Sequence, residues 1–519
     1  MEERDRDAPG DDLGDDLGDD LGQAPGPPAE RNRVQRFLVW LNRVALGAFF
    51  QRVEVEGRER VPPENSGPLI VVANHVNGLI DPMLVLGATP LFPRFLGKST
   101  LWDIKPLRPI LEGAKVIPVY RRQDKGVDTS RNREAFAASR RVLTEGGVIC
   151  LFPEGKSHNE PTLAPLKTGA ARMALEAEAE ALADGGTPAG VRFLPIGLSF
   201  DAKQKFRSRT LVEIGEPFPA LTAAGITSEE GRAELARRVA GDGDGDGDSG
   251  EAGAPREAVA ALTAAIDDAL QAVTLNFDTW QEARLMRRAA EIWRHPARDV
   301  PRRGRLSESA PLLRAFAEGY RVLKESHPEE VERTAEAVRL YDRLLTTAGL
   351  RDRHVASTYP LPPVAGFLRH SLANLLLRLP LAVVGTILNA VPFSIVKLIG
   401  GRVKILHQKA TWKLFPALLT YPITWIAEAV AAGWWLASTT GAAWAGWLLA
   451  LAVLVLAPVA GWEALLFHDR RSRLLHEVKA FLKLRTRRRF TERLREQRQD
   501  IRRRVAGLVD RYRDLPSGS

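Results

Sequence analysis

Two adjacent apolar runs near the C-terminus constrain the fold more than any other feature of the chain. LFPALLTYPITWIAEAVAAGWWLA (414–437) and GAAWAGWLLALAVLVLAPVAGW (441–462) are each long enough to cross a hydrocarbon layer of about 30 Å. Only STT (438–440) joins them, so we expect a membrane hairpin. Basic residues lie on both outer sides of the hairpin, which predicts that both ends face the cytoplasm. Those before it are Arg402, Lys404, Lys409 and Lys413, and an Arg-rich tail follows.

A third apolar stretch, LPLAVVGTILNAVPFSIVKLIG (379–400), does not fit a single crossing. If the chain is cytoplasmic on both sides of this stretch, it must leave the membrane where it entered. Pro380, Asn389 and Pro392 are also expected to break a helix here. We therefore predict a re-entrant or interfacial segment over 379–400.

The net charge of +9 is concentrated in the C-terminal tail. Residues 469–513 hold 17 Lys or Arg and 6 Asp or Glu. We expect a basic helical tail over 468–519 that binds anionic lipid headgroups at the cytoplasmic face, although an ordinary charged helix would look the same. Nucleic acid is not expected, because no nucleic-acid-binding fold accompanies the tail. Cys150 is the only cysteine, which excludes an intramolecular disulfide.

Composition divides the rest of the chain into segments. The repeat GDDLGDDLGDDLG and the Pro-rich sequence after it predict a disordered acidic tail. Next comes an amphipathic helix that either packs on the following domain or lies in a membrane interface. The expected segments are the tail at 1–32, this helix at 33–52, an α/β domain at 53–220, a linker at 221–255, a helical region at 256–370 and a membrane region at 371–467.

The segment 53–220 alternates short apolar strands with helical stretches. This pattern predicts an α/β fold with a mainly parallel sheet flanked by helices. The helices are expected at 131–146 and 166–182. The strands are expected at 69–73, 94–97, 115–120, 147–152, 193–200 and 210–215.

Polar side chains follow the first of these strands in NHVNGLIDP (74–82). A His and a carboxylate within reach of each other can form a general base with its orienting partner, here His75 and Asp81. The alternative is a polar turn in which Asp81 caps the next helix.

Two more polar loops follow later strands. FPEGKSHNEP (152–161) places Glu154 and Gly155 at the carboxyl end of a strand, where open α/β sheets bind ligands. GAKVIPVYRRQDKG (113–126) leads into Arg121 and Arg122, and arginine binds phosphate through two parallel hydrogen bonds. Each loop, taken alone, could be an ordinary surface connection.

Together and in this order, the three loops resemble the motifs of the glycerolipid acyltransferase family, the glycerol-3-phosphate and lysophosphatidate acyltransferases. The resemblance covers 34–220 and extends to the helical stretches 269–293 and 319–352. These stretches and the hydrophobic region look like the larger fungal-type glycerol-3-phosphate/dihydroxyacetone-phosphate acyltransferases. Five residues separate His75 from Asp81, as in the fungal-type members, whereas most of the family has four.

The resemblance implies acyl transfer from a thioester to a hydroxyl group. His75 would remove the hydroxyl proton, Asp81 would hold the other ring nitrogen, and Arg121 would bind the phosphate of the acceptor. Arg122 is the less favoured register for that phosphate contact. The expected substrate-binding set also includes Asn74, Phe152, Pro153, Glu154, Gly155, Lys156 and Ser157, and Pro195 matches the fourth motif.

No cofactor or metal is implied, because the thioester is already activated and the nine histidines lack ligand spacing. The resemblance implies acyl-CoA or acyl carrier protein as the donor. The expected acceptor is glycerol-3-phosphate, which the subfamily resemblance favours, or dihydroxyacetone phosphate, lysophosphatidate or another lysophospholipid. A rival interpretation is a non-catalytic, membrane-anchored lipid-binding or scaffold protein.

Overall fold

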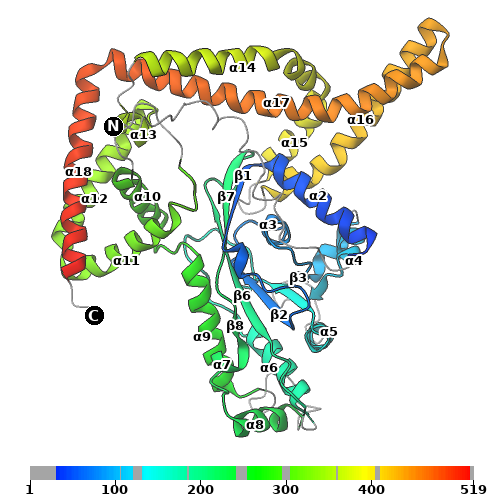
Figure 1. Cartoon of the computed structure of the whole chain (residues 1–519), viewed down its shortest axis with the longest axis vertical. Helices are drawn as coiled ribbons and strands as arrows, with labels where there is room; N and C mark the ends of the chain where they lie inside the picture. Colours follow the sequence, from blue (N-terminus) through cyan, green and yellow to red (C-terminus); the bar gives the residue numbers. More distant parts are fainter. Residues whose placement is uncertain are drawn as a thin grey trace, which may run out of the picture. The chain divides into compact units, whose positions relative to one another are not determined.

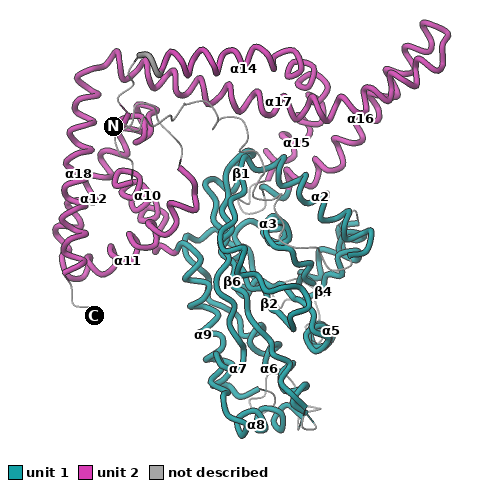
Figure 2. Tube along the Cα trace, viewed as in Figure 1, with its two compact units in different colours: residues 1–275, 405–411 teal, residues 276–404, 412–519 magenta. Residues whose placement is uncertain are grey.

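The computed structural model describes residues 31–105, 107–120, 131–183, 186–240, 254–294, 304–357, 361–403 and 409–514. The chain divides into two compact units, which Figure 2 shows in different colours. Unit 1 comprises residues 1–275 and 405–411, and unit 2 comprises residues 276–404 and 412–519. The acidic repeat and most of the Gly/Asp run of the expected linker lie outside the described residues.

Unit 1 is built on an eight-stranded, mainly parallel sheet with the order β1-β7-β6-β2-β5-β3-β4, and β8 pairs with β6 (Figure 1). The pairs β2–β6, β2–β5, β5–β3 and β3–β4 are parallel, whereas β7 and β8 run antiparallel to β6. This confirms the predicted fold class. The strands are β1 Phe50–Glu56, β2 Leu69–Ala73, β3 Arg94–Lys98, β4 Ile117–Val119, β5 Val148–Leu151, β6 Arg192–Phe200, β7 Ser208–Ile214 and β8 Phe218–Pro219.

Helices flank the sheet of unit 1. Apolar side chains of α5, α6 and α9 form one buried core with strand residues such as Ile70 and Ile149. Burial of this apolar surface is the main force that holds helices and strands together. The helices are α2 Arg33–Phe49, α3 Ile80–Ala88, α4 Arg108–Gly113, α5 Asn132–Thr144, α6 Gly169–Leu182, α7 Ala220–Ala223, α8 Glu229–Ala240 and α9 Arg256–Val273, with short 3-10 turns at Arg58–Arg60 and Ser99–Asp103.

The expected segment boundaries differ from the structure in three places. The helix expected at 33–52 ends at Phe49, because the following residues pair with β7 as strand β1. The expected linker at 221–255 contains helix α8. Helix α9, expected in the helical region, belongs to unit 1, because Leu262 and Ile266 are buried in the sheet's core.

Helix α2 has two apolar faces. Val39, Leu46 and Phe49 are buried as the helix packs on α3 and β1. The opposite face exposes Phe37 and Trp40, each to more than half of its surface. Helix α2 therefore packs on the domain and also exposes an aromatic face. Whether this face contacts a membrane stays a prediction.

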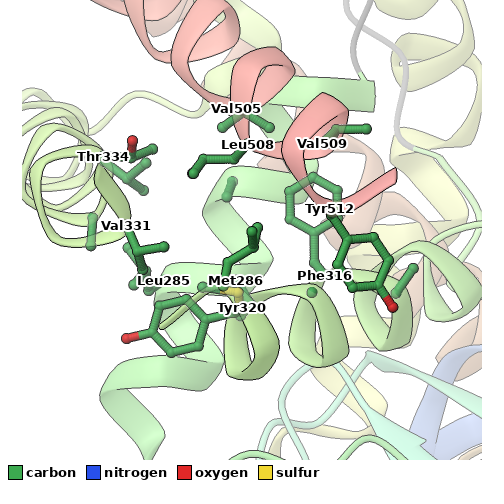
Figure 3. Close-up of a pocket in the computed structure, with 16 residues that line it drawn as sticks. Leu285, Met286, Phe316, Tyr320, Val331, Thr334, Val505, Leu508, Val509 and Tyr512 are labelled. Atoms are coloured by element: carbon green, nitrogen blue, oxygen red, sulfur yellow. The ribbon is translucent and has the colours of Figure 1, made fainter. Parts of the chain in front are cut away.

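Unit 2 contains a helical part in which α18 packs against α10, α11, α12 and α13. An apolar pocket of about 110 Å³ lies among α10, α11, α12 and α18 (Figure 3). Its lining is almost wholly apolar, and Tyr320, Thr334 and Tyr512 contribute the only side-chain polar groups. The helices are α10 Trp280–Arg294, α11 Ala310–Ser326, α12 Pro328–Ala348, α13 Asp352–Ala356 and α18 Arg488–Asp514.

The membrane region of unit 2 consists of α14 Leu361–Leu388, α15 Ala390–Arg402, α16 Thr411–Thr440 and α17 Ala443–Thr486. Among the described helices, α14, α16 and α17 are long and apolar enough to cross a membrane. The expectation that Pro380 breaks a helix is wrong, since Pro380 lies inside α14 and the break falls at Asn389. Proline is tolerated in such apolar helices because neighbouring helices compensate for the lost backbone hydrogen bond.

Candidate active site

Two loops of the candidate site leave neighbouring strands at the same edge of the sheet. Strands β2 and β5 are parallel, and Val72 pairs with Leu151 near the carboxyl ends of both. The loop that carries His75 follows β2, and the loop that carries Glu154 and Ser157 follows β5. The register therefore brings together residues that are about 80 positions apart in the sequence.

His75 and Asp81 are in contact. The imidazole Nδ1 lies 2.8 Å from Asp81 Oδ2, and the same oxygen accepts hydrogen bonds from the backbone amides of Val76 (2.9 Å) and Asn77 (2.7 Å). Asp81 is fully buried at the start of α3, so its carboxylate orders the loop as well as the ring. Because Nδ1 faces a carboxylate, it carries the ring proton, and Nε2 is left as the basic nitrogen.

The basic nitrogen faces a hydroxyl group. Ser157 Oγ lies 2.7 Å from His75 Nε2, close enough to donate a hydrogen bond. The ring of Phe152 stacks on the imidazole, with 4.3 Å between the ring centroids. The imidazole is thus held on its face and at both nitrogens, and its side chain is 13% exposed.

Glu154 links the two loops. Its Oε1 accepts a hydrogen bond from the backbone amide of His75 (2.5 Å), and its Oε2 accepts one from Ala164 (2.8 Å). The same Oε2 is bonded to Nε2 of His158, which is also buried. Both carboxylate oxygens are engaged inside the protein, so Glu154 holds the loops in place. The expected contact of Glu154 with substrate stays a prediction.

The other predicted residues lie in the same loops but differ in exposure. Asn74 exchanges two hydrogen bonds with the backbone of Leu198 on β6, which ties the end of β2 to the neighbouring strand. Gly155 has a φ of +71°, a conformation that glycine adopts without strain. The Pro153 carbonyl accepts a backbone hydrogen bond, and Lys156 is exposed.

Arg121 and Arg122 lie outside the described residues, so their predicted role in binding phosphate stays a prediction. They follow β4, which is parallel to the strands that carry the two loops. No group of three or more His, Cys, Asp or Glu side chains within the described ranges is arranged to hold a metal ion.

Lys203 is a site residue that the sequence interpretation missed. Its ammonium donates hydrogen bonds to the carbonyls of Val76 (3.1 Å) and His158 (3.4 Å), one in each loop. Burial lowers the pKa of Lys203, and the nearby carboxylates of Asp81 and Glu160 partly oppose that shift. The available signal was its position just after β6, whose carboxyl end lies at the same edge as that of β2.

Cys150 has a different environment from the loops. It is fully buried in β5, and burial raises the pKa of its thiol. A thiol that is both buried and hard to ionise is a poor nucleophile. The structure therefore gives Cys150 no place in the chemistry of the site.

Two family models match separate parts of the chain. Residues 52–199 match the model described as Acyltransferase, and residues 300–514 match the glycerol-3-phosphate acyltransferase 2 C-terminal domain. Residues 52–199 hold both loops of the candidate site. Residues 300–514 include most of the helical part of unit 2 and all four membrane-region helices.

Similar proteins occur in two yeasts. An uncharacterized acyltransferase of Schizosaccharomyces pombe is 26% identical over 434 residues, which cover 76% of this chain and 57% of that protein. Glycerol-3-phosphate O-acyltransferase 2 of Saccharomyces cerevisiae is 27% identical over 320 residues, which cover 58% of this chain and 38% of that protein. The chain thus spans little more than half the length of the first relative and less of the second.

Among solved structures, the 1-acyl-sn-glycerophosphate acyltransferase PlsC from Thermotoga maritima is similar to part of the chain. The match has 22% sequence identity and a TM-score of 0.28, and it covers 40% of this chain and 79% of that one. The two family models and the yeast relatives point to the same group. Residues 52–199 thus match an acyltransferase domain and residues 300–514 a glycerol-3-phosphate acyltransferase 2 C-terminal domain, and the chain is similar to the fungal-type glycerol-3-phosphate acyltransferases.

Proposed function

We propose that the protein is a membrane-bound enzyme that transfers a fatty acyl group from a thioester to a hydroxyl of glycerol-3-phosphate or a lysophospholipid. The contact chain from Asp81 Oδ2 through the His75 ring to Ser157 Oγ supports this proposal most strongly. It provides a base whose proton-accepting nitrogen already lies at hydrogen-bonding distance from a hydroxyl oxygen.

In the proposed reaction the acceptor hydroxyl takes the place beside Nε2 that the Ser157 hydroxyl occupies. His75 removes the hydroxyl proton as the oxygen attacks the thioester carbonyl, and Asp81 stabilises the imidazolium that forms. When the carbon–sulfur bond breaks, the imidazolium returns the proton to the leaving thiolate. The products are an ester and a free thiol, so no further reactant is needed.

The acceptor and the donor are identified by one experiment. Full-length protein, reconstituted in vesicles, is given labelled acyl-CoA or acyl carrier protein and a panel of acceptors, and the products are identified by mass. We expect glycerol-3-phosphate to be the best acceptor, because the S. cerevisiae relative carries that name. Lysophosphatidate as the best acceptor would instead place the enzyme at the next acylation.

His75→Ala is the matched control for this assay. It removes the base but leaves the buried core untouched, so we expect a folded protein with no transfer. Activity in the wild type that disappears in His75→Ala excludes the rival scaffold interpretation. Substantial turnover by the folded variant would remove His75 as the base.

A second mechanism deserves a test because of one contact. Ser157, His75 and Asp81 are connected as a nucleophile, base and orienting acid would be in covalent acyl transfer. In direct transfer Ser157→Ala keeps most of the activity, and no acyl-enzyme accumulates when the donor is added alone. Loss of activity together with an acylated Ser157 in the mass spectrum would establish the covalent route.

We also propose that the enzyme works at the cytoplasmic face of a membrane. The α16–α17 hairpin and the basic residues beside it support this orientation. A thiol reagent that does not cross membranes should label a cysteine introduced at Thr440 from the side opposite the cytoplasm. Labelling from the cytoplasmic side would contradict the orientation.

A further inference from the structure

Helix α14 has the length and composition of a membrane span, and one of its faces is unusually exposed. Leu372, Leu376, Leu379, Val383 and Ile387 recur every three or four residues and are 40–68% exposed. That spacing places them in one stripe along the helix. Leu375 and Ala382, at one edge of this stripe, are buried, whereas Leu377, on another side of the helix, is 81% exposed. The stripe is therefore an apolar surface that needs a partner.

Helix α14 packs against α17 along most of its length, and the contacts between them show which side of α14 is covered. The two helices run side by side in opposite directions (Figure 1). At one end Asn389 Nδ2 donates to the Ala457 carbonyl (3.1 Å), and a Cβ at Gly385 would collide with the Ala460 carbonyl. Farther along α14, Arg378 pairs with Glu463 at 2.5 Å. Leu375 and Ala382 cluster with Phe467, and Leu474 packs against them.

The half of α17 that packs on most of α14 is highly charged. Helix α17 has 44 residues and is therefore about 66 Å long, roughly twice the thickness of the hydrocarbon layer. Residues 443–462 have no charged side chain and fill that thickness. Residues 463–486 hold nine charged side chains: Glu463, Asp469, Arg470, Arg471, Arg473, Glu477, Lys479, Lys483 and Arg485.

If α14 crossed the membrane, it would take these charges through the hydrocarbon layer with it, because its neighbour over residues 375–389 is residues 457–474 of α17. Charged side chains are strongly disfavoured at that depth, and the five within residues 457–474 (Glu463, Asp469, Arg470, Arg471 and Arg473) outweigh the gain from one apolar helix. Composition alone indicates a span, but the packing partner excludes it.

The hairpin sets the side of the membrane on which this pair lies. Helices α16 and α17 touch at Gly433 and Gly446, where a Cβ on either glycine would lie within 2.7 Å of the other's carbonyl oxygen. Such close approach is typical of paired membrane helices. Figure 1 shows the hairpin pointing away from the α14–α17 pair. The pair therefore begins where the hairpin leaves the hydrocarbon layer.

We propose that α14 and the charged half of α17 lie in the plane of the membrane surface and bind a bilayer that contains anionic lipid. The apolar stripe of α14 contacts the acyl chains, and basic residues of α17 such as Arg471 and Lys479, both exposed, face the headgroups. Helix α17 contains Pro458, and Figure 1 shows that it changes direction between the hairpin and the α14–α17 pair. This bend lets the charged half lie along the surface of the bilayer that the hairpin enters, which makes the bilayer the natural occupant. This arrangement also keeps both ends of α14 on the cytoplasmic side, as the charged flanks of the hairpin require.

The depth of α14 is measured in the full-length protein in vesicles of phosphatidylcholine and phosphatidylglycerol. Single cysteines replace Leu372, Leu376, Val383 or Ile387 and carry an environment-sensitive fluorophore. Cys150 does not interfere, since it is fully buried and burial raises its thiol pKa. Lipids with a quencher near the headgroup or near the chain end report depth. We expect all four positions to be shallow and equal.

Controls define the two ways in which the proposal fails. Cysteines at Val430 and Leu451, in the hairpin, should be quenched best by the deep probe, and Leu340, an exposed residue of α12, should not be quenched. A deep centre with shallow ends on α14 would show that it crosses the membrane. Absence of quenching at all four positions would show that protein or water, and not lipid, covers the stripe. Neither result depends on enzymatic activity.

Discussion

Asp81→Asn tests whether the carboxylate stabilises a charged His75 during the reaction. Asp81 Oδ2 lies 2.8 Å from the His75 ring and accepts two backbone amides. An asparagine oxygen in its place would still accept those bonds and keep the ring oriented, but its negative charge would be gone. Two unit charges about 4 Å apart attract by roughly 4 kcal/mol at an effective dielectric constant near 20.

That loss applies only when the imidazolium forms, so it should appear in kcat and not in KM. At about 1.4 kcal/mol per tenfold change, with some screening at the partly exposed ring, we expect kcat to fall about 100- to 1000-fold. The asparagine amide would also replace Asp81 Oδ1, which has no hydrogen-bond partner among the described residues. A modest decrease in thermal stability should therefore accompany the loss of rate.

The assay is steady-state acyl transfer with saturating donor and varied acceptor, together with thermal unfolding of the same preparations. A folded Asp81→Asn protein whose kcat stays within about fivefold of the wild type would refute the reasoning, because about 1 kcal/mol is too little for a buried charge in contact with an imidazolium. A rise in KM at unchanged kcat would assign Asp81 to substrate binding.

Three further predictions concern two residues of the candidate site and one ion pair in the helical part of unit 2. Glu154→Gln should lower the free energy of unfolding by about 2–4 kcal/mol, measured by thermal unfolding, because buried charge-assisted hydrogen bonds are lost; unchanged stability would contradict its role in linking the loops. The lowered pKa of Lys203 means that it loses its proton as the pH rises through a value below 10.5; rates measured against pH should therefore decline there, and Lys203→Arg should move the decline to higher pH. Arg498→Ala, which removes the buried ion pair with Asp352, should cost about 3–5 kcal/mol of stability, whereas the exposed Arg503→Ala should cost little. Equal effects would mean that α18 is not part of the folded helical core.

Short buried strands were predictable because their apolar runs end at polar loops. LIVVA at 69–73 became β2 with the expected limits. Strand β1 was missed because its alternating sequence, FQRVEVE, follows directly on an amphipathic helix and was interpreted as the end of that helix. The packing of α9 in unit 1 was not predictable either, because the spacing of apolar residues in α9 indicates a helix but not the element against which it packs.

In the candidate site, too, some contacts were predictable from the sequence and others were not. Spacing and strand ends predicted that His75 and Asp81 would meet, and that Glu154 would lie at the same edge of the sheet. The contact of His75 with Ser157 was not predicted, because it depends on the register between β2 and β5. The contact of Glu154 with His158, four residues apart in one loop, depends on how that loop folds. Sequence spacing has no information on such register when the strands are far apart in the chain.

The order of the strands predicts how far Arg121 lies from His75, and the neighbouring Arg122 provides a matched control. The loop with His75 follows β2, and both arginines follow β4, three strands away in the order β2-β5-β3-β4. Neighbouring strands lie about 4.8 Å apart, so these strand ends are separated by about 14 Å, a gap that a long arginine side chain and a phosphorylated acceptor could bridge together. Losing a charged hydrogen bond to phosphate costs about 1.5–3 kcal/mol, so Arg121→Ala should raise KM for glycerol-3-phosphate about 10- to 100-fold, whereas Arg122→Ala should change it much less. The same comparison with glycerol as acceptor, which lacks the phosphate, should show no difference between the two variants. If both substitutions raise KM equally, or if the glycerol reaction suffers as much as the phosphorylated one, then the guanidinium does not bind the acceptor's phosphate.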